Sequence, residues 1–299
     1  MRKVILSRRF EMKVGIGEGA YSRYGISEGA KKAKAHGYDC YDVGRFVNTE
    51  TDFFKLPEEE FKSEILKIRA LIEAEGITVW QVHSPWRHPA KDFTPEDRAE
   101  RLECFLKAIR GAGYFGATHF VLHALMPFGT NSPDHPEEMK NINAEFMKRL
   151  YEEAVAYGVK YIDIENLPFP SLPINHTCQC LEFAKRMNAE TNSDTFKVCL
   201  DTGHANFCGE SPGDAVRMVG KEYLGSLHVH DNNGKADQHK TPGNGTIDWD
   251  DFSNALSEIG FDGCVNFETA VPGDIPAGEE RDRLEKELAD CGKKIAKLI

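Results

Sequence analysis

Residues 195–204 read TFKVCLDTGH, and this stretch decides the fold. Its first six residues are rich in β-branched, aromatic and aliphatic side chains, as is typical of a buried parallel strand. Asp201 follows at the expected carboxyl end of that strand, and His204 comes three residues later. A carboxylate and an imidazole delivered there together are well suited to bind a divalent metal ion. Since Asp-x-x-His also occurs in ordinary loops, the other strands must decide between the two interpretations.

The same alternation of a short apolar run and an amphipathic stretch occurs about eight times. Glycines follow the predicted helices, as expected of C-caps, and Thr94-Pro95 has the residue types of a helix start. The predicted strands are 12–16, 38–43, 77–82, 118–122, 159–164, 195–200, 224–229 and 263–267. The predicted helices are 27–36, 57–75, 94–114, 137–157, 177–189, 212–219, 249–259 and 277–298.

Eight such units in a chain of 299 residues favour a closed (β/α)8 TIM barrel with a C-terminal helix. The alternative is an open doubly wound sheet, but residues 15–19 (GIGEG) lack the glycine spacing of a dinucleotide-binding turn. No linker or low-complexity tract divides the sequence. We therefore predict one domain over residues 1–299.

Charge and hydropathy restrict the partners. Lysine and arginine number 37 against 48 aspartates and glutamates, so the formal charge is −11, which disfavours a nucleic-acid partner. No apolar run approaches the roughly 20 residues needed to span a bilayer. The basic N-terminus, residues 1–9, has an apolar part too short for a signal peptide, so a cytoplasmic location is predicted.

Cysteine usage fits a reducing compartment. The eight cysteines are scattered, and Cys40, Cys199 and Cys264 fall within predicted strands, which suits small core residues better than a disulfide framework. Cys178 and Cys180 are too isolated to indicate a zinc site or a redox pair.

Polar side chains follow six consecutive predicted strands, starting with the third. Each alone has an ordinary explanation as a loop histidine, a helix N-cap or a solvated carboxylate. In a barrel, however, all of them lie at the end where barrel enzymes build their sites. The set therefore predicts a metal site from His83, His123, Glu165, Asp201 with His204, His228 with His230, and Glu268.

The loop after the seventh strand adds two more candidates. Asp237 and His239 are two residues apart, so in an extended segment they project to the same side and can share a second metal or grip a substrate hydroxyl. The alternative is a solvated loop. Three aromatic residues, Trp86, Phe128 and Trp249, are candidates for the pocket floor, although such residues are more often core.

Several strings together resemble one family. These are Ile164-Glu165-Asn166, Leu200 to His204, His228-Val229-His230-Asp231, Asp237-Gln238-His239 with Pro242-Gly243-x-Gly245, and Phe267-Glu268. From about residue 12 to residue 270 the chain resembles the xylose isomerase-like TIM-barrel superfamily, which holds sugar isomerases and epimerases, inosose dehydratase and endonuclease IV.

The resemblance implies one divalent metal, commonly manganese, magnesium, cobalt or zinc, held by Glu165, Asp201, His228 and Glu268. His228 rather than His230 matches the family's ligand. Endonuclease IV holds up to three zinc ions, and its motif positions are matched by His83, His123, Glu165, Asp201, His204, His228, Asp237, His239 and Glu268. Against that reading, no arginine- or lysine-rich loop is present to hold a phosphate backbone. The ketose 3-epimerases carry an arginine where this chain has Gly234.

We therefore expect a metal-dependent isomerase or epimerase that acts on a sugar or sugar phosphate through an enediolate. Glu165 and Glu268 would transfer protons, with His204 and His239 as candidates for a proton shuttle or leaving-group acid. His83, Trp86 and His230 are expected to contact the carbohydrate, and His83, His123, His204, Asp237 and His239 to hold a second metal or the substrate.

Three alternatives stay open. One is a multi-zinc phosphodiesterase of the endonuclease IV type. The others are a sugar dehydratase or lyase subunit, and a barrel that binds a sugar without turnover. A homo-oligomer is compatible with the family, but no apolar stripe in the sequence indicates the interface.

Overall fold

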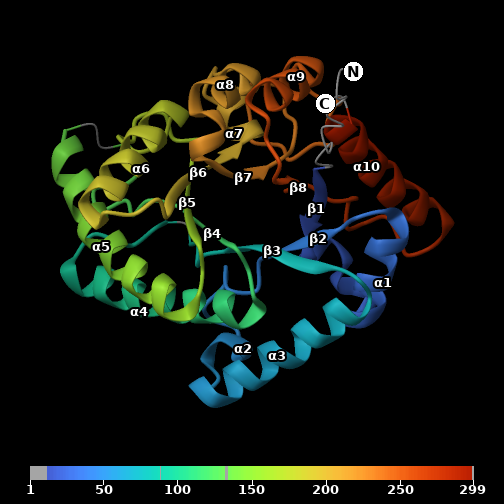
Figure 1. The fold of residues 1–299 in the computed structure, drawn as a ribbon, viewed down its shortest axis with the longest axis horizontal. Helices are drawn as coiled ribbons and strands as arrows, with labels where there is room; N and C mark the ends of the chain where they lie inside the picture. The colour runs from blue at the N-terminus through green and yellow to red at the C-terminus, as the bar shows by residue number, and fades with distance from the viewer. Residues whose placement is uncertain (1–11, 88, 132–133, 298–299) are drawn as a thin grey trace, which may run out of the picture.

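The computed structural model describes residues 12–87, 89–131 and 134–297. At its centre lies an eight-stranded parallel sheet with the order β7-β6-β5-β4-β3-β2-β1-β8. A bridge between Val229 and Phe267 joins the two edge strands, so the sheet forms a nearly closed ring (Figure 1). The strands are β1 (Lys13–Gly17), β2 (Cys40–Val43), β3 (Thr78–His83), β4 (His119–Leu122), β5 (Tyr161–Glu165), β6 (Phe196–Asp201), β7 (Leu224–His228) and β8 (Cys264–Phe267).

Helices surround this ring on its outside (Figure 1). Thr94 caps the helix after β3 through a reciprocal capping box with Asp97, and Gly116 ends it in the left-handed conformation. The main helices are α1 (Ile26–His36), α3 (Glu58–Ala74), α4 (Pro95–Phe115), α5 (Pro136–Tyr157), α6 (Thr177–Thr191), α8 (Pro212–Tyr223), α9 (Trp249–Ile259) and α10 (Glu279–Lys297). The predicted TIM barrel with a C-terminal helix is confirmed.

The sequence analysis missed three short helices: the 3-10 helix η1 (Glu18–Tyr24), α2 (Asp52–Lys55) and α7 (Thr202–Phe207). Each is too short to show a helical hydrophobic period, and α7 begins directly after the Asp201 that ends β6. Helix α8 also runs to Tyr223, past the predicted end at 219, across a kink at Gly220. The prediction for residues 1–9 lies outside the described residues.

Alternation along the strands separates a hydrophobic layer from a polar barrel interior. On β6, Phe196 and Leu200 belong to the main hydrophobic core. Lys197, Cys199 and Asp201 point to the other side of the same strand, and all of them are buried. The outward layer holds the helices on the sheet, while the inward layer is free to carry chemistry at the carboxyl ends of the strands.

The three cysteines that were predicted to lie within strands do so. Cys40, Cys199 and Cys264 are buried free cysteines inside the barrel strands. Cys178 is exposed whereas Cys180 is buried, so these two neighbours face different ways on α6. Within the described part of the chain, no helix combines the length and the hydrophobicity needed to cross a bilayer.

Candidate metal centre at the mouth of the barrel

Four side chains from four strand ends converge at the mouth. Ligand atoms of Glu165, Asp201, His228 and Glu268 all lie within 4.8 Å of one another. Register explains the convergence, because Asp201 lies directly beside His228 and Glu165 beside Cys199 in the parallel sheet. His228 Nδ1 is 3.1 Å from Glu165 Oε1 and 3.4 Å from Glu268 Oε2. The four predicted metal ligands therefore lie together.

A second donor group shares Glu165. His123 Nε2 lies 2.9 Å and His83 Nε2 3.4 Å from Glu165 Oε2. The two imidazoles meet edge to face with ring centroids 5.0 Å apart. Because the other oxygen of Glu165 faces His228, this carboxylate bridges the second group and the quartet.

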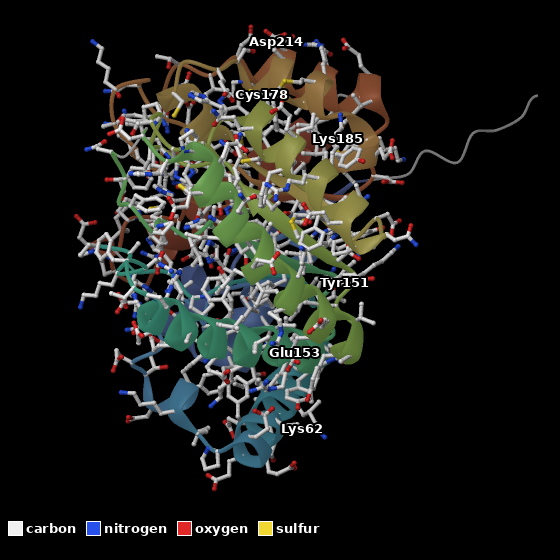
Figure 2. The ribbon with its side chains drawn as sticks, turned by 90° about the vertical axis from the view of Figure 1, so that its left-hand side faces the viewer. Lys62, Tyr151, Glu153, Cys178, Lys185 and Asp214 are labelled. Carbon is white, nitrogen blue, oxygen red and sulfur yellow. The ribbon has the colours of Figure 1, made fainter. Side chains whose placement is uncertain are left out.

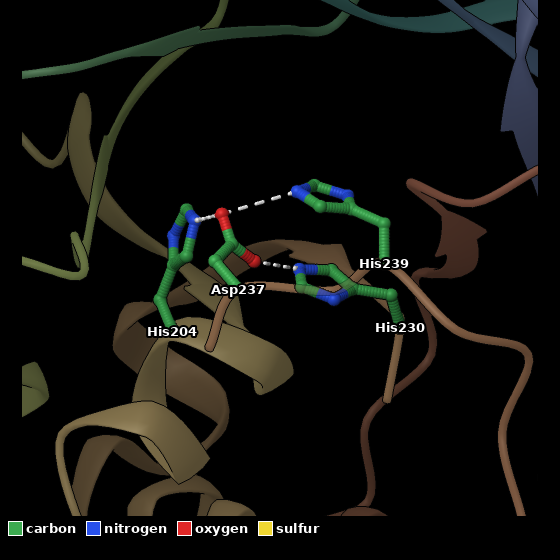
Figure 3. A group of neighbouring side chains, drawn as sticks. All are labelled: His204, His230, Asp237 and His239. Carbon is green, nitrogen blue, oxygen red and sulfur yellow. Dashed lines mark hydrogen bonds and ion pairs between the residues drawn. The ribbon is translucent and has the colours of Figure 1, made fainter. Parts of the chain in front are cut away.

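A third group lies on α7 and on the loop after β7 (Figure 3). Asp237 is its centre, with Oδ2 lying 3.4 Å from His204 Nε2 and 3.3 Å from His239 Nε2. His230 Nε2 approaches Asp237 Oδ1 at 3.9 Å and Asp201 Oδ2 at 3.0 Å. The predicted neighbours Asp237 and His239 do lie together. The segment is not extended at His239, however, whose φ is 45°.

Three of the histidines are oriented in the same way. His83, His204 and His239 each donate Nδ1–H to a backbone carbonyl, at 2.8, 2.9 and 2.7 Å. A carbonyl can only accept, so Nδ1 carries a proton and Nε2 is the nitrogen that faces a carboxylate, Glu165 for His83 and Asp237 for His204 and His239. Metal-binding histidines commonly have their second nitrogen held in this manner.

Asp42, inside β2, holds the central imidazole. Its Oδ2 lies 3.0 Å from His228 Nε2 and accepts hydrogen bonds from Gln81 and Asn266. His228 therefore presents Nδ1 to the quartet while a buried carboxylate fixes its other nitrogen. The sequence analysis did not identify Asp42, since it lies within a strand rather than at a strand end.

Asp201 has two tasks. Its Oδ1 accepts the backbone N–H of His204 at 2.6 Å and so caps α7, while Oδ2 faces His230. Gly203, which lies between Asp201 and His204 in the sequence, packs directly against the His230 ring, and a Cβ there would clash with that ring. The Asp-x-Gly-His pattern thus brings the carboxylate and His204 together on one tight turn.

Asp231 organises the loop that carries Asp237 and His239. It is fully buried and accepts six hydrogen bonds, at 2.8–3.3 Å, from the backbone N–H groups of residues 232, 243, 245, 246 and 247 and from Trp249 Nε1. Backbone hydrogen bonds of 2.8 Å in both directions also pair it with Lys240. One carboxylate therefore fixes both ends of this loop.

The donor groups open onto a cavity of about 470 Å³. His83, Trp86, His123, Glu165, His204, Asp237, His239 and Glu268 line it, together with the unpredicted Val47, Leu167, Pro168 and Phe169. Two of the three aromatic candidates for the pocket floor do not line it. Phe128 packs in a side cluster against His135, and Trp249 binds Asp231, so neither lines this cavity. His230 is fully buried and lies beneath His239 with ring centroids 3.9 Å apart, so it does not line the cavity either.

The charges of the cluster are strongly coupled. Burial opposes the ionisation of Glu165, but His228 and His123 outweigh it and hold the pKa of Glu165 well below its usual value. Burial lowers the pKa of His123 to about 4. Burial also opposes the charge of His204, yet Asp201 and Asp237 raise the pKa of His204 to about 10. Burial raises the pKa of Glu268 to about 7.

The donors fit a divalent cation. Glu268 Oε2 is buried and accepts no hydrogen bond within the described residues, although it faces His228 Nδ1. Carboxylate and imidazole are the ligand set that suits zinc, manganese and related ions. Buried carboxylates facing one another also need positive charge between them, which a metal ion supplies. Fold and site together define a TIM-barrel protein with a candidate metal centre at the carboxyl ends of its strands.

Comparison with known proteins identifies the family. Residues 30–293 match the model of the family described as xylose isomerase-like TIM barrel, and the chain belongs to this family. A D-psicose 3-epimerase of Agrobacterium fabrum is 31% identical over 262 residues, or 81% of this chain and 78% of that protein. A probable endonuclease 4 of Acholeplasma laidlawii is 25% identical over 241 residues, or 75% of this chain and 78% of that one.

The fold of a solved relative agrees. D-psicose 3-epimerase with D-tagatose from Clostridium cellulolyticum H10 matches with a TM-score of 0.74 and 21% identity, covering 95% of this chain and 99% of that chain. The resemblance predicted from the sequence motifs is thus confirmed, and the relatives include both sugar epimerases and a probable endonuclease.

Proposed function

We propose that the protein is a metal-dependent isomerase or epimerase acting on a small sugar or sugar phosphate. The observation that carries the proposal is the quartet of Glu165, Asp201, His228 and Glu268 beside a cavity of about 470 Å³. This volume suits a small molecule. Among the described residues that line the cavity, none is a lysine or an arginine, which favours a polyol over a nucleic-acid backbone.

A divalent ion at the quartet would supply Lewis acidity to adjacent carbonyl and hydroxyl oxygens of the sugar, which favours an enediolate. The chain's own residues then position the sugar and move its protons. Glu165 and Glu268 reach the cavity from β5 and from the end of β8, so they can remove and return a proton from different directions. An epimerase needs both directions, whereas an isomerase can use one.

Trp86 and Phe169 supply apolar surface to the cavity, and His204 and His239 supply polar contacts. We assign the first pair to packing against the carbon face of the ring and the second pair to its hydroxyls or to proton shuttling. The ketose 3-epimerases carry an arginine where this chain has Gly234, which has no side chain to contact the sugar. The polar contacts would therefore come from the histidines.

The experiment is a metal analysis followed by incubation with a panel of ketoses and ketose phosphates in deuterium oxide. One tightly bound divalent ion, with deuterium incorporated at a carbon beside the carbonyl, would support the proposal. Metal and ligand binding without any exchange would contradict it and favour a sugar-binding barrel or a lyase subunit.

A second function is favoured by a separate observation. Three adjoining donor groups are present, one around Asp237, one around the quartet and one at His83, His123 and Glu165. Only the quartet is needed for the isomerase. A multi-metal phosphodiesterase would use all three, with two or three zinc ions activating water. About three zinc ions per chain together with cleavage of abasic DNA would establish this function instead.

A further inference from the structure

A second polar cavity lies at the opposite end of the barrel from the candidate metal centre. Its volume is about 310 Å³. It lies where β4 to β7 begin, because His119, Tyr161, Lys197 and Leu224 are at or near the first residues of these strands. Its lining includes three lysines, Lys160, Lys197 and Lys221, and two carboxylates, Glu222 and Asp262.

Lys197 is a buried cation without a carboxylate partner in the described chain. It is only 7% exposed, and its Nζ donates to the backbone carbonyl of Glu222 at 2.8 Å. Its ammonium also lies 5.2 Å from the centre of the Tyr161 ring. One carbonyl leaves two of its three N–H donors available. A buried positive charge left in this state is costly, so a ligand that supplied negative charge would be favoured.

Lys160 adds a second cation to the same wall. Its Nζ lies 4.7 Å from the centre of the Tyr161 ring, on which Lys197 also packs, and it forms no ion pair with the described residues. The third lysine of the cavity, Lys221, is already paired with Asp262 at 2.9 Å. Two ammonium groups therefore share one aromatic ring and have no counter-charge in contact.

The remaining wall adds one unpaired donor, although the carboxylates of Glu222 and Asp262 also line the cavity. The buried indole Nε1 of Trp80 has no hydrogen-bond partner among the described residues. His119 stacks on Trp80 with ring centroids 5.1 Å apart, and its Nδ1 is committed to Asp163 at 2.8 Å. Three lysines against two carboxylates give the lining a small local excess of positive charge in a chain whose formal charge is −11.

We propose that this cavity binds a small oxyanion, such as the phosphate or carboxylate group of a metabolite, with Lys160 and Lys197 as its charged ligands. Charge-assisted hydrogen bonds from two ammonium groups suit an acceptor-only ligand. The Tyr161 and Trp80 rings provide flat surface for the apolar part of the molecule. The site is separate from the mouth and does not depend on the proposed activity.

The test uses the metal-loaded protein and inorganic phosphate as the probe, with thermal unfolding and calorimetric titration as readouts. We expect the midpoint of unfolding to rise with phosphate beyond the effect of chloride at equal ionic strength. In Lys197→Met, phosphate affinity should fall by about tenfold or more, because a charge-assisted hydrogen bond is lost. Without phosphate this variant should be at least as stable as the wild type, because an unpaired buried charge has been removed.

One control variant and one further test variant separate this site from others. Lys185, on α6 and labelled in Figure 2, packs on Tyr223 as Lys197 does but does not line the cavity. Lys185→Met should therefore respond to phosphate like the wild type. Lys160→Gln serves as a second variant at an exposed position and should also weaken phosphate binding.

Glu165→Gln, at the other end of the barrel, should keep the phosphate response. Loss of the response in Glu165→Gln would place the phosphate at the mouth and overturn the proposal. Equal phosphate affinities in the wild type and Lys197→Met, or no response beyond that of chloride, would overturn it as well.

Discussion

The two halves of the candidate centre are held in different ways. Glu165, Asp201 and His228 lie on barrel strands, Glu268 follows β8 directly, and sheet register brings the four together. Asp237 and His239 lie on a loop, where one buried carboxylate, Asp231, holds the backbone on both sides of them. The strand-end half is fixed by the whole fold, whereas the loop half is held mainly by one side chain, that of Asp231.

The difference suggests that the two halves can be separated by mutation. A change in the quartet should affect every donor group that shares its carboxylates. A change at Asp231 should disturb the loop ligands and leave the quartet in place.

Glu165→Gln should have the largest effect. Glu165 contacts His83, His123, His204 and His228, so the amide removes the charge shared by the quartet and by the His83 group. Under the proposed function, the rate of solvent deuterium exchange should fall by about a thousandfold, since a proton-transferring group and a metal ligand are lost together. Metal analysis should show loss of the quartet ion, with circular dichroism as the control for folding. If the variant kept its full metal content and activity, Glu165 would not be part of the metal centre.

Asp231→Asn should destabilise the loop half. The amide group would face N–H donors of residues 243 and 245 and of Trp249, which need an acceptor. We expect a loss of about 3 kcal/mol in unfolding free energy, since buried donors are left unsatisfied. Limited proteolysis should cut within residues 232–247, and any ion bound at Asp237 should be lost while the quartet keeps its own.

Asp248→Asn is the matched control for this variant. Asp248 caps α9 at the end of the same loop by accepting from the Asp251 N–H. Asparagine is an equally good N-cap, so the change should cost well under about 1 kcal/mol. Equal metal loss in Asp231→Asn and Asp248→Asn would mean that Asp231 has no special role in the loop.

Asp42→Asn should lower the metal affinity of the quartet, although Asp42 is not one of its four ligands. The substitution removes the charge that faces His228 Nε2, while leaving the size of the side chain unchanged. Metal affinity should fall by about 10- to 100-fold, which is typical of partners that orient a metal ligand. Competition with a chelator measures this. Ser226→Ala, which removes a buried barrel hydroxyl without a hydrogen-bond partner in the described chain, should leave the affinity unchanged.

Asp237→Asn should have the smallest effect under the isomerase proposal. The side chain is 31% exposed, and its partners are the loop and α7 histidines rather than the quartet. Deuterium exchange should fall by no more than about tenfold while the quartet ion is retained, because the change lies outside the inner ligands. If the protein is instead a multi-metal phosphodiesterase, the same variant should lose an ion and most of its activity.

The same comparison explains what could be read from the sequence. Parallel strands end on one rim, so the first polar residue after each apolar run, such as Glu165 or His228, could be placed at the mouth without coordinates. The spacing of Asp201 and His204 likewise predicted a shared site. The positions of these side chains at the mouth follow directly from the period of the strands and their register.

Residues whose role depends on tertiary contacts could not be placed. Asp42 lies within the predicted strand 38–43 rather than at its end, and only the closed barrel brings it to His228. Trp249 was only a candidate for the pocket floor, and its indole N–H instead donates to Asp231. The loop residue Phe169 lines the cavity but carries no motif that would have identified it.

The most direct test is an anomalous difference map from a crystal grown with manganese. If these four side chains hold the metal, a strong peak should lie at about 2 Å from ligand atoms of Glu165, Asp201, His228 and Glu268 together. A map with no peak at these four side chains, or with its strongest peak elsewhere on the molecule, would contradict this assignment.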